Sequence, residues 1–121
     1  MKYLRLFADG QGESHFEEIE AELEPVTYAP PAPSFDVSAP MDATRYVFVR
    51  MPSGWSGDMH CTPRRQLFCV MAGEIEGTAS DGTARTLDPG GMLVMEDTEG
   101  KGHATRVTSP EDVLAVMVHL E

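Results

Sequence analysis

Short stretches of apolar residues recur along the chain, and most of them end at glycine, proline or aspartate. The clearest are rich in β-branched and aromatic residues, which is typical of β-strands. They predict strands over residues 3–7, 45–51, 66–72, 74–79, 84–87, 92–95, 103–107 and 113–120. Tight turns are predicted between some of these strands, at Ser80-Asp81-Gly82 and at Asp88-Pro89-Gly90-Gly91. Many short strands separated by such turns favour an all-β sandwich or barrel.

Two segments near the N-terminus are less regular. Residues 14–23 fit a helix capped by Ser14, with Glu17 three residues on, but they also fit a strand. We favour a strand for their first part because the surrounding sequence is β-like. Residues 29–40 carry four prolines, which excludes a helix interior and predicts an extended connection or edge segment.

Size and charge limit the domain count and the partners. The 121 residues fit one domain. Within it we expect an N-terminal arm with edge strands over residues 1–40, which wraps the barrel or pairs with a neighbour, and a barrel over residues 41–121. A net charge of −11 excludes nucleic-acid binding through backbone phosphates and disfavours anionic lipid. No apolar run approaches the roughly 18 residues that a membrane span needs.

The two cysteines, Cys61 and Cys69, predict free thiols. If they share a strand, about 3.3 Å per residue separates them by roughly 26 Å, which is too far for a disulfide. The first residues lack the sustained apolar core of a signal peptide. We therefore expect a cytoplasmic protein.

One spacing pattern is specific: Gly54, five residues, His60, one residue, Thr62, three residues, Gln66, six residues, Gly73. It resembles the first motif of the cupin family, which has a second His at the Thr62 position and a Glu at the Gln66 position. The turn at 88–91, the strand over 92–95 and the loop to His103 resemble the second motif. That loop is longer than usual, and Val107 stands where an Asn often follows. The resemblance implies an all-β, single-domain fold, the cupin-type double-stranded β-helix or jelly-roll barrel.

The resemblance also implies a site for a divalent transition metal, which three imidazoles and one carboxylate hold in the family. His60 and His103 occupy the first and last positions of that site, whereas Thr62 and Gln66 replace a His and the Glu. Hydroxyl and amide oxygens are weak ligands for transition metals. We therefore expect either no required cofactor or a weakly bound divalent transition metal at His60, Gln66 and His103.

Strand alternation also predicts a pocket that contains residues of the first motif. If the chain stays extended after His60, then His60, Thr62, Arg64 and Gln66 share one face, and Phe68 continues inward. A polar mouth above an apolar floor is typical of small-molecule pockets. We therefore predict Thr62, Arg64, Gln66 and Phe68 as ligand-binding residues.

Other side chains near this pocket have two possible roles each. Trp55 could line the pocket and stack on a flat ligand, or cover the edge of the core. Either Arg64 or Arg65 could face inward and bind a carboxylate or phosphate, or both could form surface ion pairs. Glu96 could act as a general base beside the imidazoles, or simply end a strand. The two histidines outside the motifs are expected to be structural or exposed.

Three functions remain open. We favour a barrel that binds a small molecule, as a metal-independent isomerase, cyclase or lyase with His60 and His103 as acid and base and Glu96 as a further catalytic candidate. The second is a metal-dependent, dioxygenase-like cupin enzyme with the reduced ligand set His60, Gln66 and His103. The third is a non-catalytic binding or structural barrel. Because small cupins resemble dimers built by sheet extension, we also expect a homodimer.

Overall fold

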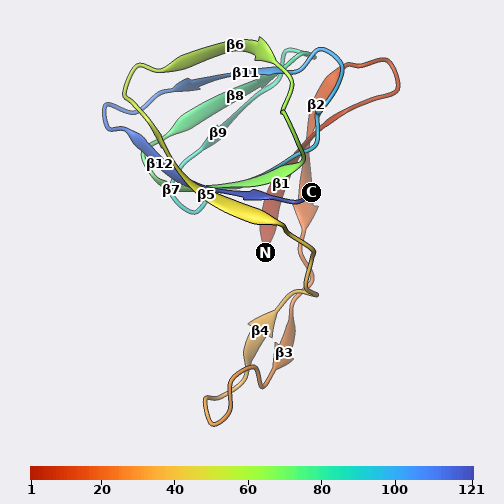
Figure 1. The fold of residues 1–121 in the computed structure, drawn as a ribbon, viewed down its shortest axis with the longest axis vertical. Helices are drawn as coiled ribbons and strands as arrows, with labels where there is room; N and C mark the ends of the chain where they lie inside the picture. Colours follow the sequence, from red (N-terminus) through yellow and green to blue (C-terminus); the bar gives the residue numbers. More distant parts are fainter.

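A computed structural model that describes residues 1–121 shows two facing β-sheets and a separate hairpin (Figure 1). The first sheet has six strands in the order β2-β1-β10-β7-β12-β5. In that order they are β2 (Ser14–Glu20), β1 (Lys2–Ala8), β10 (Met92–Met95), β7 (Gln66–Ala72), β12 (Val113–His119) and β5 (Arg45–Met51). Neighbours run antiparallel except β1 and β10, which are parallel with Leu4 opposite Leu93. The first strand of the chain is therefore built into the interior of the sheet.

The second sheet has four strands and brings the two motifs together. Its strands, in sheet order, are β6 (Ser56–His60), β11 (His103–Val107), β8 (Ile75–Ala79) and β9 (Ala84–Leu87). β11 lies between β6 and β8, so that His103 pairs with His60 on one side and Ala79 on the other. The register thus fixes the two histidines of the motifs side by side.

The remaining strands, β3 (Glu24–Val26) and β4 (Phe35–Val37), form a hairpin that pairs only with itself. It projects away from the two facing sheets (Figure 1). Residues 1–40 therefore divide into two parts: β2 forms an edge of the large sheet and β1 lies inside it, whereas residues 21–40 contain the projecting hairpin. The structure contains no helix that could cross a membrane.

Alternating side chains of the facing sheets fill the core. β7 contributes Phe68 and Val70 to it, because these residues and Gln66 point inward while the residues between them point outward. The buried apolar residues are Leu6, Phe68, Val70, Ile75, Ala79, Leu87, Leu93, Met95, Val107, Val113 and Ala115. They come from both sheets and form one cluster.

The structure confirms an all-β fold, and a strand rather than a helix at residues 14–20. It contradicts an extended chain from His60 to Gln66, because β6 ends at His60 and β7 begins at Gln66. Residues 61–65 form a loop in which the Thr62 amide donates to the Asp97 carbonyl at 3.1 Å. Cys61 and Cys69 therefore do not share a strand, although both thiols are free.

Candidate functional site

A cavity of about 110 Å³ lies between the two sheets. Its lining residues are Met51, Trp55, His60, Gln66, Phe68, Ile75, Gly77, Leu87, Leu93, Met95, His103, Thr105 and Met117. An engineered apolar cavity of about 150 Å³ holds benzene, so this space suits only a small organic group. Five residues singled out from the sequence, Trp55, His60, Gln66, Phe68 and His103, line it together.

The two imidazoles stand next to each other at this cavity. The ring centroids of His60 and His103 lie 4.8 Å apart, with an angle of 51° between the ring planes. His103 is buried, whereas His60 is exposed. His60 Nδ1 lies 2.6 Å from the Asp58 carbonyl oxygen, which can only accept, so Nδ1 carries a proton. In the neutral ring, Nε2 of His60 is then left with a free lone pair.

His103 is oriented by a carboxylate that the sequence reasoning missed. Asp97, fully buried, places Oδ2 2.5 Å from His103 Nδ1. Its other oxygen, Oδ1, accepts a hydrogen bond from the Thr62 hydroxyl at 2.7 Å. With Nδ1 engaged, Nε2 of His103 has no hydrogen-bond partner in the chain. Strand alternation could have indicated Asp97 from the sequence. Met95 points inward on β10, and Asp97, two residues later, is expected to point the same way.

Three predicted site residues lie elsewhere, two of them because the loop over 61–65 breaks the strand alternation. Thr62 is buried behind His103 and does not line the cavity. Arg64 is exposed and forms no ion pair. Glu96 has the opposite parity to Asp97, and it lies between Arg5 Nε at 2.5 Å and Arg65 Nε at 2.7 Å. The structure thus places all three outside the cavity: Thr62 and Arg64, which were predicted to bind the ligand, and Glu96, which was predicted to be catalytic.

Arginines hold Glu96 in its charged form. Partial burial alone would raise the pKa of Glu96, but the hydrogen bonds from Arg5 and Arg65 outweigh it and lower that pKa. A carboxylate with a lowered pKa, held by two guanidinium groups, is a weak base. Glu96 therefore stabilises the contact between β1 and the loop over 61–65.

The side chains present do not fit the four-ligand metal site that the family resemblance implies. No group of three or more His, Cys, Asp or Glu side chains is arranged to hold a metal ion. The Asp97 carboxylate is engaged by His103 and Thr62, and Gln66 Nε2 donates to Met95 Sδ at 3.8 Å. The cavity therefore offers two imidazoles and the amide oxygen of Gln66, which is a weak ligand, and this donor set is better suited to acid–base chemistry than to holding a dication.

The loop that leads to His103 is anchored on the turn between β1 and β2. The Ser14 hydroxyl, fully buried, donates to the Gly102 carbonyl at 2.7 Å. The Lys101 amide donates to the Gly12 carbonyl at 2.9 Å. These bonds tie the residues before His103 to a turn far away in the sequence, and so fix where β11 begins.

Gly102 is required at the start of β11. Its φ is +75°, and a Cβ there would collide with the backbone of His60 and Cys61. Gly82 has a similar φ of +91° but open space around it, with nothing within 4 Å. We expect Gly82→Ala to cost about 1–2 kcal/mol from the left-handed backbone alone. Gly102→Ala should lower the free energy of unfolding clearly more than Gly82→Ala does, and urea unfolding of both variants measures the difference. Equal losses would show that the close approach of β6 and β11 is absent.

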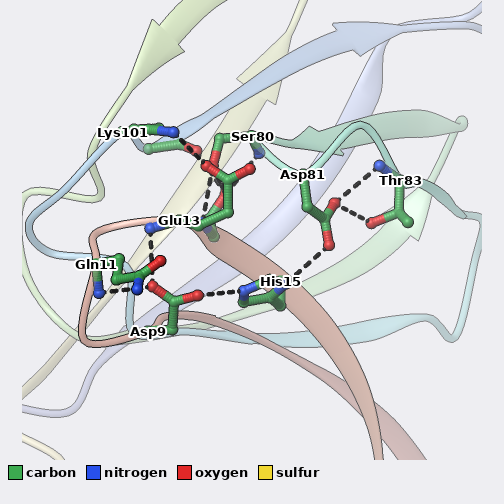
Figure 2. A network of polar contacts seen from close by, with 10 residues as sticks. Asp9, Gln11, Glu13, His15, Ser80, Asp81, Thr83 and Lys101 are labelled. Atoms are coloured by element: carbon green, nitrogen blue, oxygen red, sulfur yellow. Dashed lines mark hydrogen bonds and ion pairs between the residues drawn. The ribbon is translucent and has the colours of Figure 1, made fainter.

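Figure 2 shows a polar network that joins this turn to the turn between β8 and β9. His15 Nε2 lies 2.7 Å from Asp9 Oδ2, and Nδ1 lies 2.9 Å from Asp81 Oδ2. Both partners only accept, so both contacts are hydrogen bonds only when the ring is protonated. The hydrogen bonds to Asp9 and Asp81 raise the pKa of His15, and those from Thr83 lower the pKa of Asp81 to about 2.

This network predicts a defined pH dependence of stability. Because the folded-state pKa of His15 is raised, its contribution is complete below its unfolded pKa of about 6.5 and is lost as pH rises through the folded value. The free energy of unfolding of wild type should therefore exceed that of His15→Gln at about pH 6, and the difference should shrink at alkaline pH. Urea unfolding of both proteins across pH measures it. A difference that stays constant between about pH 5 and pH 9 would contradict a charged His15 in the network.

Comparison with known proteins gives the fold. No protein family model matches the chain. No curated protein matches it either. A cupin 2 conserved barrel domain protein from Salinispora arenicola superposes with a TM-score of 0.53 at 14% identity, covering 84% of this chain and 76% of that one. A cupin superfamily protein from Desulfitobacterium hafniense gives 0.51 at 19% identity, covering 69% and 72%.

A cupin domain from Bordetella pertussis is similar in the same way. It gives a TM-score of 0.51 at 14% identity and covers 85% of this chain and 97% of that one. Identities this low bear on the fold alone. Together with the two facing sheets and the pairing of β6 with β11, they show that this chain has the cupin jelly-roll fold.

Proposed function

We propose that the barrel binds a small organic molecule and moves a proton on it without a metal, with His103 as the base. The observation that carries this proposal is the buried Asp97–His103 pair, with Nε2 of His103 unpaired beside His60 at an apolar cavity. A carboxylate behind an imidazole fixes its tautomer and stabilises the imidazolium that forms when the ring takes a proton.

The energetics of the pair support use rather than packing. A fully buried carboxylate is costly unless it is hydrogen-bonded and paired, and an apolar residue of similar volume is often equally stable there. Asp97 has both partners, and it holds its imidazole at the cavity instead of in a closed core. The arrangement is therefore well suited to proton transfer.

The second imidazole supplies the complementary step. One ring takes a proton from the bound molecule, and the other, when protonated, returns a proton at a different atom. This exchange is the chemistry of isomerases, cyclases and lyases, in which no electrons are gained or lost overall. His60 is exposed at the rim and can exchange its proton with water, whereas His103 is buried and held by Asp97.

The lining of the cavity defines the kind of ligand. Phe68, Ile75 and Leu93 form an apolar surface that suits a short hydrocarbon or ring. Trp55 packs over Gly57, where a Cβ would lie 2.9 Å from Cη2 of the indole and 3.5 Å from Cε1 of His60. We propose a ligand with a carbonyl, hydroxyl or carboxylate group toward the imidazoles and an apolar part against Phe68.

We place the protein in the cytoplasm as part of this proposal. Both thiols are free, which is typical of a reducing compartment.

The test is a screen of small keto acids, hydroxy acids and ketones by ligand-observed NMR in D2O. Binding should be lost in His103→Ala, weakened in Asp97→Asn and retained in His15→Ala, which removes an imidazole outside the cavity. A bound molecule should also exchange a carbon-bound proton for deuterium faster with wild type than with His103→Ala. Binding without exchange would contradict the catalytic part and favour a non-catalytic binding barrel.

A further inference from the structure

One buried polar atom of the chain has no hydrogen-bond partner, and it belongs to a histidine outside the two motifs. Nδ1 of His119 is buried and unpaired, and no other buried side-chain nitrogen or oxygen is in that position. A polar group that is taken out of water without a partner destabilises the fold. A purely structural or exposed histidine, as expected from the sequence, does not account for this nitrogen.

The strand register places His119 next to the cavity between the sheets. His119 pairs with Gln66 of β7, and residues paired across antiparallel strands have their side chains on the same face. Gln66 lines the cavity, and so does Met117, which lies two residues before His119 on β12 and therefore also shares its face. His119 thus continues the wall of the cavity by one position, at the end of β12.

Gln66 is a second polar side chain in this wall with free hydrogen-bonding capacity. It is 5% exposed, and its Nε2 donates to Met95 Sδ at 3.8 Å. A thioether sulfur is a weak acceptor, and an amide nitrogen carries two protons. Gln66 can therefore donate to an oxygen atom in the cavity without losing a strong hydrogen bond.

The register also brings a cation to the same row. His119 pairs with Arg45 of β5 on its other side, so that Gln66, His119 and Arg45 follow one another across three neighbouring strands. Val49 and Met51 have the parity of Arg45 and pack against the core, which assigns this row to the inner face. Arg45 is exposed at the start of β5. In a chain of charge −11, an anion needs such a local cation to bind.

We propose that Gln66, His119 and Arg45 form a carboxylate subsite at the end of the cavity, so that the molecule bound by the barrel is a small carboxylic acid. This inference rests on the proposed function and names its substrate class. A guanidinium group binds both oxygens of a carboxylate, and Nδ1–H of His119 and the Gln66 amide can donate to the same group. One arginine matches the single charge of a carboxylate better than the double charge of a phosphate.

The subsite leaves the rest of the molecule to the residues already described. With the carboxylate at this row, the carbonyl or hydroxyl group of a keto or hydroxy acid faces the two cavity imidazoles, and its hydrocarbon part lies against Phe68. The subsite residues thus fix the orientation of the molecule, whereas His103 moves the proton.

The first test uses acetate alone as the probe. Sodium acetate replaces sodium chloride at constant ionic strength, while NMR follows the carbon-bound imidazole protons of the four histidines. The His119 resonances should shift saturably in wild type and stay unmoved in Arg45→Met. Arg50→Met is the matched control and should behave as wild type, because Arg50 is exposed on the same strand but pairs with Leu114 on the outer face.

Circular dichroism checks that both arginine variants are folded, as expected for the replacement of exposed side chains. His119 resonances that do not respond to acetate, or that respond equally in Arg45→Met, would overturn the subsite.

The second test separates the subsite from the proposed function of the barrel. α-Ketobutyrate and butanone differ in a carboxylate against a methyl group, and the resonance of the single tryptophan, Trp55, reports binding in the cavity that it lines. Wild type and Arg50→Met should bind α-ketobutyrate roughly tenfold more tightly than butanone. Arg45→Met should lose this preference and keep the affinity for butanone.

The outcomes distinguish the two claims. Equal affinities of wild type for the two compounds would overturn the carboxylate subsite, although the barrel would still bind small molecules. A response of His119 to acetate that depends on Arg45, with no binding of either compound at Trp55, would support the subsite and contradict the proposed binding of small ketones and keto acids in the cavity.

Discussion

Replacing Leu6 by alanine should lower the free energy of unfolding by about 2–5 kcal/mol. Leu6 is 1% exposed in β1, pairs in register with Met95 of β10 and belongs to the core cluster. The substitution removes buried apolar surface and leaves a cavity between the sheets. Urea unfolding at a fixed protein concentration measures the loss.

The control for this substitution is Met59→Ala, which truncates a side chain that is 47% exposed in β6. It should cost less than about 1 kcal/mol. Equal small losses in the two variants would mean that the first strand is a dispensable arm, and would contradict its parallel pairing with β10.

Replacing Asp97 by alanine should cost about 3–5 kcal/mol, because it breaks a buried pair and leaves the remaining partners unsatisfied. The His103 Nδ1 proton and the Thr62 hydroxyl would both lose their acceptor in a buried site. Asp97→Asn should cost less, since the amide oxygen can still accept one of the two hydrogen bonds. Chemical denaturation of both variants gives the difference.

Glu99→Ala serves as the control, because Glu99 is an exposed acid in the same loop with no ion pair. Its loss should be close to zero. If Asp97→Ala unfolds with the stability of Glu99→Ala, the carboxylate does not support His103, and the basis of the proposed proton transfer is removed.

Strands could be predicted where propensity and turn residues agree. Residues 45–51, 66–72 and 84–87 coincide with β5, β7 and β9, because each segment ends at a glycine, proline or aspartate that begins a turn or loop. For residues 14–20 the sequence favours a strand only through its β-like neighbours, and the reason for the strand, antiparallel pairing with β1, is seen only in the structure. Local sequence cannot contain that information.

The sequence predicts the two histidines of the site but not the residues that support them. The spacing of the motifs gave His60 and His103, and the register of β6 with β11 places them side by side. Alternation places Thr62 at the cavity only if the strand continues past His60, and it places Arg64 there only if the strand also continues through Pro63; β6 instead ends at His60. A proline lacks the amide that a strand ladder needs, and the resulting loop turns Thr62 toward Asp97 instead.

The projecting hairpin was missed because its signals are weak. β3 and β4 have three residues each, and β3 contains Pro25. Most of their side chains are exposed, so no burial pattern marks them as strands.

The most direct test of the shared site is a nuclear Overhauser measurement between imidazole carbon-bound protons. Ring centroids 4.8 Å apart predict a cross-peak between His60 and His103, and neither ring should give one to His15. The Phe7–His15 pair, with centroids 5.7 Å apart, is an internal positive control. A His60–His103 cross-peak is the result that we predict. Its absence in a spectrum that shows the Phe7–His15 cross-peak would contradict a shared site at the cavity.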